Sequence, residues 1–172
     1  GSCLPKDILG LVSLANAHEV EMPLLRGAIS TNDMLIDQAY KIIIDAKYKN
    51  IALIGLAFKD GTDDLRGSPL LAVARMLEKK MLNVDYYDDY ISKSIYKGVG
   101  KKNIKTELGS IYGRLHGDIS DVLKNKELVV IGCSVNDNIL SNSSPKLVID
   151  LVNAINKKTV CDAGIAYQGL NW

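Results

Sequence analysis

Apolar residues recur at helical spacing through the first 48 residues of the chain. Residues 4–17 carry them in the pattern of an amphipathic helix, with Pro5 in the first turn, where a helix needs no backbone N–H donor. After a break around residues 19–22, Pro23 begins a second helical pattern that reaches about Tyr48. A helix of about 25 residues is about 37 Å long, which is long for a small domain.

This second predicted helix has two apolar faces. One face is formed by Leu25, Ile29, Ile36 and Ile43, and the other by Leu24, Ala28, Leu35 and Ile42. A single neighbouring layer covers only one stripe of a helix. The second face therefore predicts a partner subunit, and packing of both faces inside one chain stays open as the alternative.

From residue 50 onward, short apolar runs alternate with helical stretches. The predicted strands are residues 51–55, 83–87, 127–131, 146–150 and 159–161. Such alternation is typical of an α/β fold with a parallel, doubly wound sheet. We therefore expect two parts, a helical segment over residues 1–49 and an α/β domain over residues 50–172.

Helix signals between the predicted strands refine this picture. Ser68 and Pro69 form an N-cap and first-turn pair for a helix that ends before Asn83. Its predicted buried stripe consists of Leu70, Val73, Leu77 and Met81. Residues 90–112, with glycines at 98 and 100 and lysines at 101 and 102, lack a steady period and predict a partly helical excursion. Asp118 is expected to cap a short helix over residues 119–124.

The composition is that of a globular protein without a strong electrostatic preference. Apolar residues make up 47% of the chain and the net charge is +1, which excludes a disordered chain and predicts neither nucleic-acid nor membrane binding. The longest apolar run, residues 51–58, is far shorter than the roughly 20 residues that cross a bilayer. There is no secretory signal pattern, and the chain lacks an initiator Met, so we expect a fragment of a longer protein.

The three cysteines are an odd number without close spacing, which favours a reducing, cytoplasmic location. Cys133 and Cys161 lie in or beside predicted strands and are expected to be inert core thiols. His18 and His116 have no partner at metal-ligand spacing, and the acidic pair at residues 63 and 64 fits capping or ion pairing better than Mg²⁺ binding. No metal site is predicted.

The first crossing from strand to helix, residues 55–66, is where a ligand is expected in an open parallel sheet. Its glycines fit neither the dinucleotide fingerprint nor the P-loop. Lys59 and Arg66 offer a point charge and a bidentate fork suited to phosphate. The alternative leaves Lys59 solvated and pairs Arg66 with Asp63 or Asp64.

Cys3 stands at the start of the first predicted helix. The partial positive charge of a helix N-terminus, helped by Lys6, favours a nucleophilic thiolate. Asp7, one helical turn further, is placed to orient a water molecule or a lysine. The alternative is an ordinary cysteine near a terminus.

Three segments, in this order, resemble the UDP-glucose/GDP-mannose 6-dehydrogenase family. They are residues 1–7 (GSCLPKD), residues 23–25 (PLL) with Asn32–Asp33, and residues 55–69 (GLAFKDGTDDLRGSP). The resemblance covers nearly the whole chain. The GDP-mannose branch of the family is more similar than the UDP-glucose branch in three features. These are the sequences of the first and third segments, the lysine-rich residues 100–108 and the final Trp172. Gly67, where the family often has an acidic residue, and the variable Asp60 depart from the pattern.

The resemblance implies a Rossmann-like sheet domain and a long helix at the core of a homodimer or higher homo-oligomer. In that family, NAD is bound mainly by an N-terminal domain, so this chain would be the C-terminal part that begins at the catalytic cysteine. Cys3 resembles the nucleophile of a four-electron oxidation of a sugar C6 alcohol, and Asp7 the residue that positions the hydrolytic water. Lys6 resembles a contact near the cofactor, Lys59 a contact to the sugar nucleotide, and Arg66 a contact to the NAD pyrophosphate.

Two further readings remain open beside this one. The chain could be a non-catalytic nucleotide-binding or dimerisation module of the same fold, or the enzyme could act on UDP-glucose instead of GDP-mannose. A receiver-like signalling domain, suggested by Asp88 after the second predicted strand, lacks the acidic cluster and lysine that its chemistry needs. The fragment alone is not expected to reduce NAD, because the glycine-rich NAD loop of the family lies upstream.

Overall fold

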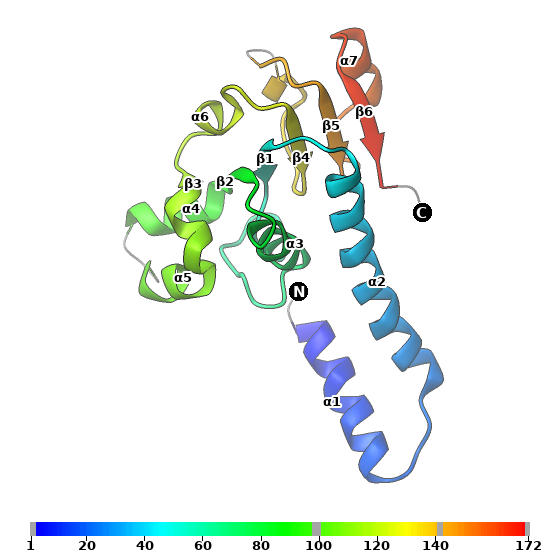
Figure 1. The fold of residues 1–172 in the computed structure, drawn as a ribbon. Helices are drawn as coiled ribbons and strands as arrows, with labels where there is room; N and C mark the ends of the chain where they lie inside the picture. Colours follow the sequence, from blue (N-terminus) through cyan, green and yellow to red (C-terminus); the bar gives the residue numbers. More distant parts are fainter. Residues whose placement is uncertain (1–2, 98–100, 141–142, 171–172) are drawn as a thin grey trace.

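The computed structural model describes residues 3–97, 101–140 and 143–170 of the chain. Two helices, α1 (Cys3–Ala17) and α2 (Pro23–Asp45), form an antiparallel arm that projects from the rest of the molecule (Figure 1). The start of α1 and the end of α2 both lie at the sheet domain. Helix α2 ends at Asp45, slightly before the predicted end.

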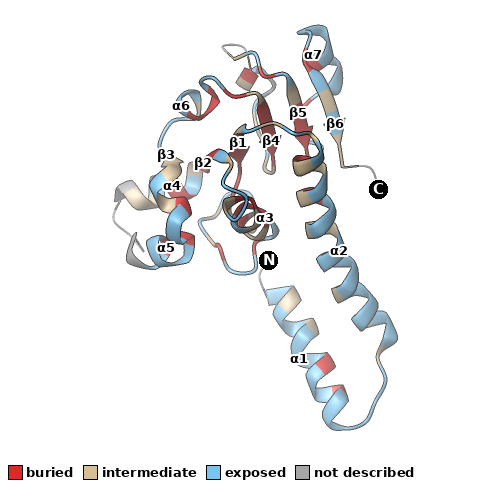
Figure 2. Cartoon of the chain, in the orientation of Figure 1, coloured by how far each residue is buried: buried red, intermediate tan, exposed pale blue. Residues whose placement is uncertain are grey.

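The helical arm is largely exposed (Figure 2). Helix α1 buries only Val12 and Ala15, and α2 buries only Ala39 and Ile43, which lie where it meets the sheet domain. Leu24 keeps 83% of its surface exposed and Met34 keeps 67%. The alternative in which both faces of the long helix pack inside one chain is therefore wrong for the first half of α2.

The rest of the chain forms a six-stranded sheet in the order β3-β2-β1-β4-β5-β6. The strands are β1 (Asn50–Ile54), β2 (Asn83–Tyr87), β3 (Leu115–His116), β4 (Leu128–Ile131), β5 (Leu147–Asp150) and β6 (Ala166–Gly169). Every neighbouring pair is parallel. The predicted fold class, an α/β chain with a doubly wound parallel sheet, is confirmed.

Helices and short 3₁₀ turns connect the strands. They are α3 (Pro69–Glu78), α4 (Asp89–Lys97), α5 (Lys101–Leu108), α6 (Ile119–Leu123), α7 (Lys157–Asp162), η1 (Gly109–Arg114) and η2 (Asp137–Leu140). The described part of the expected excursion over residues 90–112 consists of most of α4, of α5 and of the start of η1, and the glycines at 98 and 100 lie outside the described residues. Asp118 caps α6 by accepting a hydrogen bond from the Ser120 N–H, as predicted.

The strand predicted at residues 159–161 is wrong. These residues lie in α7, which begins when the Asn156 side chain accepts a hydrogen bond from the Lys158 N–H. The β-branched residues Thr159 and Val160 favour a strand by intrinsic propensity. The helix forms instead because the Asn156 side chain satisfies a backbone N–H of its first turn, and Val160 alone among its residues is buried. The last strand is β6, and neither β6 nor the two-residue β3 was predicted.

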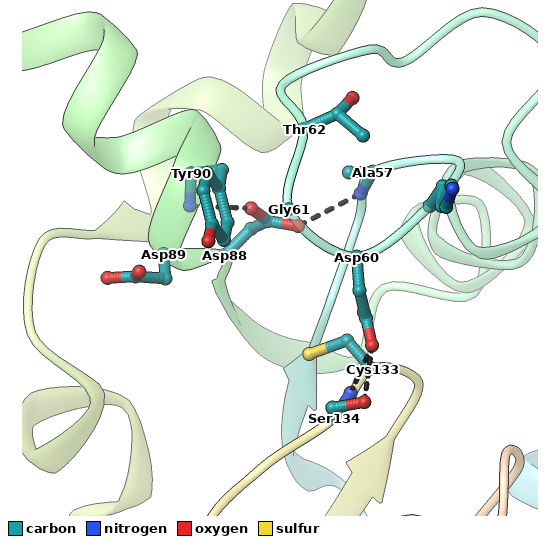
Figure 3. A pocket seen from close by; sticks show the side chains of 10 residues that line it. Ala57, Asp60, Gly61, Thr62, Asp88, Asp89, Tyr90, Cys133 and Ser134 are labelled. Atoms are coloured by element: carbon teal, nitrogen blue, oxygen red, sulfur yellow. Dashed lines mark hydrogen bonds between the residues drawn. The ribbon is translucent and has the colours of Figure 1, made fainter.

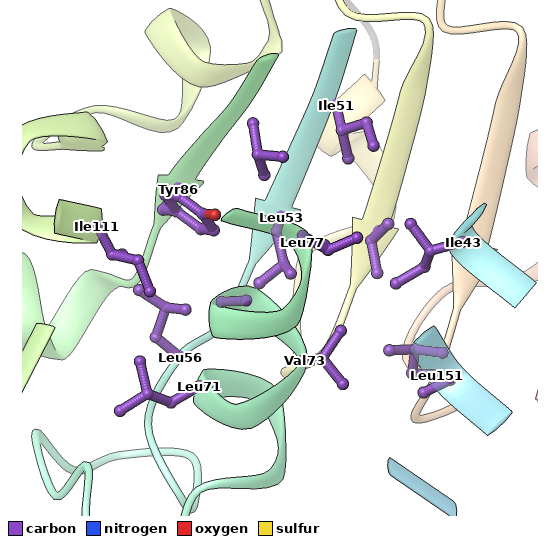
Figure 4. Close-up of a cluster of buried hydrophobic side chains, with 14 of the residues drawn as sticks. Ile43, Ile51, Leu53, Leu56, Leu71, Val73, Leu77, Tyr86, Ile111 and Leu151 are labelled. Atoms are coloured by element: carbon purple, nitrogen blue, oxygen red, sulfur yellow. The ribbon is translucent and has the colours of Figure 1, made fainter. Parts of the chain in front are cut away.

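Two apolar clusters lie on opposite faces of the sheet, because successive strand residues point to opposite sides. On one face, Ile51 and Leu53 of β1 contact a cluster that includes the end of α2, helix α3 and residue Ile111 (Figure 4). On the other face, Ala52 and Ile54 contact a cluster that includes α6 and α7 residues. Helix layers on both faces complete the doubly wound architecture.

Helix α3 begins as the sequence predicts. The Ser68 hydroxyl accepts a hydrogen bond from the Leu71 N–H, and Pro69 occupies the first turn. The predicted stripe is partly wrong, because Met81 lies beyond the helix end with a φ of +55° and is 96% exposed. The buried residues of α3 are Leu71, Val73, Ala74 and Leu77.

Candidate functional site

The site is built around the loop between β1 and α3, residues 55–68. Gly55 has a φ of +95°, and a Cβ there would lie 2.9 Å from Cβ of Cys133, so only glycine fits this close approach. Its N–H donates to the Tyr87 carbonyl at 2.8 Å. Further along, the Phe58 N–H donates to the Asp64 carbonyl at 2.8 Å, which closes the loop on itself.

A pocket of about 280 Å³ lies beside this loop (Figure 3). Its lining comes from the loop itself, from the start of α4 and from the segment after β4, and includes Lys59, Gly61, Thr62, Tyr90 and Ser134. These segments follow the carboxyl ends of β1, β2 and β4, where the strand order reverses. The pocket is therefore at the position where open α/β sheets bind ligands, as the sequence predicted.

Three carboxylates line this pocket, and each has hydrogen-bonding partners. Asp60 accepts from the Ser134 N–H at 3.0 Å and from the Ser134 hydroxyl, which ties the loop after β1 to the segment after β4. Asp89 pairs with Lys93 at 2.6 Å. Asp88 accepts only backbone N–H groups. Lys59, by contrast, is exposed and forms no ion pair with any described residue.

Cys133 is half-buried at the wall of the pocket. Burial, and secondarily the negative charges of Asp88, Asp60 and Asp89, raise the pKa of its thiol to about 12. This agrees with the predicted inert thiol. The same prediction is wrong for Cys161, which is exposed on α7 because the segment is a helix and turns that residue outward.

Arg66 forms the ion pair that the alternative interpretation predicted. Its Nε and Nη2 donate to the two carboxylate oxygens of Asp64, each at 2.9 Å. The guanidinium nevertheless keeps 75% of its side-chain surface exposed, so Asp64 orients it without enclosing it. The pKa of Arg66 lies above its usual value, chiefly through the hydrogen bond and charge of Asp64, with smaller contributions from Cys3 and Glu107.

Cys3 is the first residue of α1 and is exposed. Its charge contributes to the raised pKa of Arg66, and the start of α1 lies beside the sheet domain (Figure 1). Lys6 and Asp7 are exposed, and the Lys6 Nζ lies 3.8 Å from the Asp7 Oδ1. No ion pair among the described residues joins either of them to the loop after β1.

The structure thus brings together some of the predicted site residues. Lys59 lines the pocket on the same loop as Arg66, and the charge of Cys3 acts on Arg66. Lys6 and Asp7 follow Cys3 on α1 but face solvent. Asp88 and Ser134 were missed as parts of the site. Asp88 directly follows β2 and was considered only for a receiver-like domain, whereas Ser134, three residues after the end of β4, carried no local signal.

Neither a metal nor a membrane site emerges from the part of the chain that the structure describes. Among these residues there is no group of three or more metal-ligating side chains. The helices described here include none with the length and apolar character to cross a membrane.

Comparison with known proteins identifies the family. The family described as "UDP-glucose/GDP-mannose dehydrogenase family, UDP binding domain" matches residues 52–157. The chain belongs to this family. Its relatives include the GDP-mannose 6-dehydrogenase of Pseudomonas putida, 34% identical over 175 residues that span 100% of this chain and 40% of that protein. The UDP-glucose 6-dehydrogenase of Rickettsia conorii is 29% identical over 99% of this chain and 40% of that protein.

Solved structures of the family share the fold. A ternary complex of GDP-mannose dehydrogenase from Pseudomonas aeruginosa matches with a TM-score of 0.87 and 29% identity, over all of this chain and 39% of that one. A UDP-D-ManNAc dehydrogenase from Pyrococcus horikoshii matches with a TM-score of 0.69 and 26% identity, over 98% of this chain and 38% of that one. The chain therefore spans about 40% of the length of these relatives, and the matching part is the C-terminal one.

Proposed function

We propose that this chain is the part of an NAD-dependent nucleotide-sugar 6-dehydrogenase that carries the catalytic cysteine and the nucleotide-sugar site. The observations that support this most are the position of Cys3 at the head of α1, where this helix begins beside the sheet domain, and the electrostatic influence of Cys3 on Arg66 in the loop before α3. These two segments are 63 residues apart in the chain, and both carry the motifs that resemble the family. The rival reading, a non-catalytic module, gives no reason for a thiol beside a cation at the mouth of this sheet.

The proposed reaction oxidises a primary alcohol at sugar C6 to a carboxylate. The alcohol first loses a hydride from carbon and a proton from oxygen, which gives the aldehyde. The Cys3 thiolate then adds to the aldehyde carbon, and this thiohemiacetal loses a second hydride to become a thioester. Water, positioned by Asp7, attacks the thioester carbon, and the thiolate leaves as the carboxylate forms. Each of the two hydrides would pass to a separate NAD, so one turnover would consume two NAD molecules.

The cationic residues have separate roles in this proposal. Lys59, which has no carboxylate partner among the described residues, binds the sugar nucleotide at the pocket. Arg66, held in place by Asp64, contacts the NAD pyrophosphate, because a guanidinium presents two parallel donors to phosphate oxygens. Lys6 lies near the cofactor. These residues fit a cofactor that this chain touches only in part, since the β1–α3 loop lacks the dinucleotide fingerprint.

GDP-mannose is the proposed substrate, with UDP-glucose as the alternative. Of the relatives compared here, the GDP-mannose 6-dehydrogenase of Pseudomonas putida has the higher identity, and the Pseudomonas aeruginosa enzyme has the higher TM-score. Calorimetric titration of the chain with GDP and with UDP tests the preference. We expect GDP to bind more tightly, and equal binding of both nucleotides would refute the choice.

The exposed apolar surface of the arm supports a homodimer or a higher homo-oligomer. Leu4, Leu9 and Leu14 of α1 are more than half exposed, as are Leu24 and Met34 of α2. An apolar surface of this kind typically marks an interface. We also propose a cytoplasmic location, since the cysteines are all free thiols.

The reactivity of Cys3 is the direct test of the catalytic role. The chain is treated with iodoacetamide at pH 7, and labelling of each cysteine is followed by peptide mass spectrometry. Cys161, also exposed, is the internal reference. We expect Cys3 to react about fivefold faster or more, as a catalytic nucleophile should beside a thiol that has no catalytic role in this proposal. Equal rates at the two cysteines, or faster reaction at Cys161, would contradict the proposed nucleophile.

A further inference from the structure

Asp88 is the residue at the site whose role the proposed mechanism does not explain. It follows β2 directly and is 5% exposed. Its Oδ2 accepts hydrogen bonds from the N–H groups of Leu56 and Ala57, both at 2.9 Å. Its Oδ1 accepts from the N–H groups of Tyr90 and Ile91, both at 3.1 Å. One buried carboxylate thus binds four backbone donors from two segments. Figure 3 shows the bonds to the N–H groups of Ala57 and Tyr90.

These hydrogen bonds join the exit of β1 to the beginning of α4. Leu56 and Ala57 begin the loop that carries Lys59, and Tyr90 forms part of the pocket wall across from that loop. Backbone donors that are buried without a partner are costly, and an ionised carboxylate is a strong acceptor for them. The separation of the loop from α4, and with it the width of the pocket, therefore depends on Asp88.

The same arrangement determines how a phosphate can be bound here. In dinucleotide-binding sheets, the backbone amides at this crossing hold the phosphates. In this chain the first two amides after Gly55 are already bound to Asp88. A phosphate in the pocket therefore depends on side chains, and Lys59 is the lysine that lines it. Phosphate affinity therefore depends more strongly on the position of Lys59 than it would in a loop that bound phosphate through its backbone amides.

We propose that Asp88 is a positioning residue for the nucleotide site, which holds the Lys59 loop against α4 in the geometry that binds the ligand phosphates. The inference rests on the proposed function. Asp88 itself contacts no ligand in this proposal, because both of its oxygens are bound to the backbone. A loop that loses this support samples other positions, and misplacement by about 1 Å is enough to weaken a positioned contact strongly.

The chain offers a matched control at the end of another strand. Asp150 ends β5, is 1% exposed, and accepts hydrogen bonds from the N–H groups of Val152, Ala154 and Ile155. It is therefore the same kind of buried carboxylate, but it lies in a different hollow, together with Tyr167 and Lys157. Loss of Asp150 should lower stability as loss of Asp88 does, without reaching the Lys59 loop.

The test compares Asp88→Asn with Asp150→Asn. In either variant one carboxylate oxygen becomes an NH₂ group, which cannot accept from the backbone donors. Stability is measured by urea unfolding, loop mobility by hydrogen exchange of residues 55–62, and affinity by calorimetric titration with GDP and UDP where each variant is folded. We expect Asp88→Asn to speed exchange in the loop and to weaken binding of the preferred nucleotide tenfold or more. Asp150→Asn should be less stable but bind within twofold of the wild type.

The possible results separate the inference from the proposed function. If the wild type binds a nucleotide and the two variants bind it equally well, the positioning role of Asp88 is refuted and the proposed function stands. If the wild type binds neither nucleotide, the proposed function fails and the inference fails with it. Should Asp88→Asn not fold, hydrogen exchange of the wild type decides: saturating nucleotide should slow exchange in both residues 55–62 and residues 89–91, and an unchanged rate in either segment refutes the inference.

Discussion

Replacement of Ser68 by alanine tests how the loop at the site is attached to α3. The Ser68 side chain is 5% exposed and has two hydrogen bonds. Its hydroxyl donates to the Leu56 carbonyl at 2.7 Å and accepts from the Leu71 N–H at 3.2 Å. The first bond holds the exit of β1, and the second caps α3, so one small side chain fixes both ends of the loop.

The expected loss of stability follows from these two bonds. Loss of an N-cap serine costs about 1 kcal/mol. The Leu56 carbonyl belongs to a fully buried residue, and a buried acceptor left without its partner costs about 1–3 kcal/mol. We therefore expect Ser68→Ala to lower the free energy of unfolding by roughly 2–4 kcal/mol.

Urea unfolding followed by circular dichroism measures this loss. The midpoint should fall while the slope with denaturant stays unchanged, because the same surface is exposed on unfolding. Ser110→Ala, at an exposed serine in η1, is the control and should change the free energy by less than about 0.5 kcal/mol. A loss below about 0.5 kcal/mol for Ser68→Ala would refute the reasoning, since it would mean that neither bond contributes to the fold.

Three further predictions concern the arm, the half-buried Cys133 thiol and the ion pair between Asp85 and Lys126. Leu24→Glu should turn the proposed homo-oligomer into a monomer, as measured by sedimentation velocity. The control Met81→Glu, at an exposed residue outside the arm, should leave the oligomer intact. An oligomer that Leu24→Glu does not change would count against the arm as the interface. The pKa of the Cys133 thiol is about 12 in the folded chain, against 9.0 for an unperturbed thiol, so the unfolded chain releases this proton at lower pH than the folded chain. The contribution of Cys133 to the free energy of unfolding should therefore be complete below pH 9 and decrease as the pH rises toward 12. Cys133→Ala should flatten that alkaline fall in urea titrations, and an identical fall would exclude the thiol as its source. Burial alone would raise the pKa of Asp85, but the hydrogen bond and charge of Lys126 help to hold it below the usual value. The ionised Asp85 therefore stabilises the fold above about pH 4, and this contribution is lost as the pH falls below that value. Lys126→Met should cost about 1.5–3 kcal/mol at pH 7, the range for one hydrogen bond to a charged group, because Asp85 keeps its ion pair with Arg114. The acid unfolding midpoint should move to higher pH, and an unmoved midpoint would contradict the assignment.

Local patterns made much of the fold predictable. The strand over residues 83–87 was predicted with its observed bounds, because an alternating run is bracketed by a helix end and a turn. The Ser68–Pro69 pair fixed the start of α3, since a cap depends on residues within one turn. The short β6, Ala166–Gly169, was missed because two of its four residues are exposed and the other two only partly buried, so it carries no apolar run of its own.

A site residue could be predicted only where its place next to a predicted strand was enough to suggest its role. Lys59 follows from its position after the first strand, where ligands bind in such sheets. The role of Asp88 could not be predicted, because its carboxylate binds the N–H of Leu56, 32 positions earlier in the chain. No local pattern reports which backbone donors a carboxylate will reach once the strands have paired.

The parallel sheet also has a consequence for synthesis on the ribosome. The side chain of Asn50, at the start of β1, hydrogen-bonds Glu127, which enters the chain 77 positions later. At 5–20 residues per second, β1 waits about 4–15 s before its neighbour β4 has been made. During that time one edge of the apolar strand β1 is open to other nascent chains, whereas both helices of the arm, complete by residue 45, are made before any strand of this sheet.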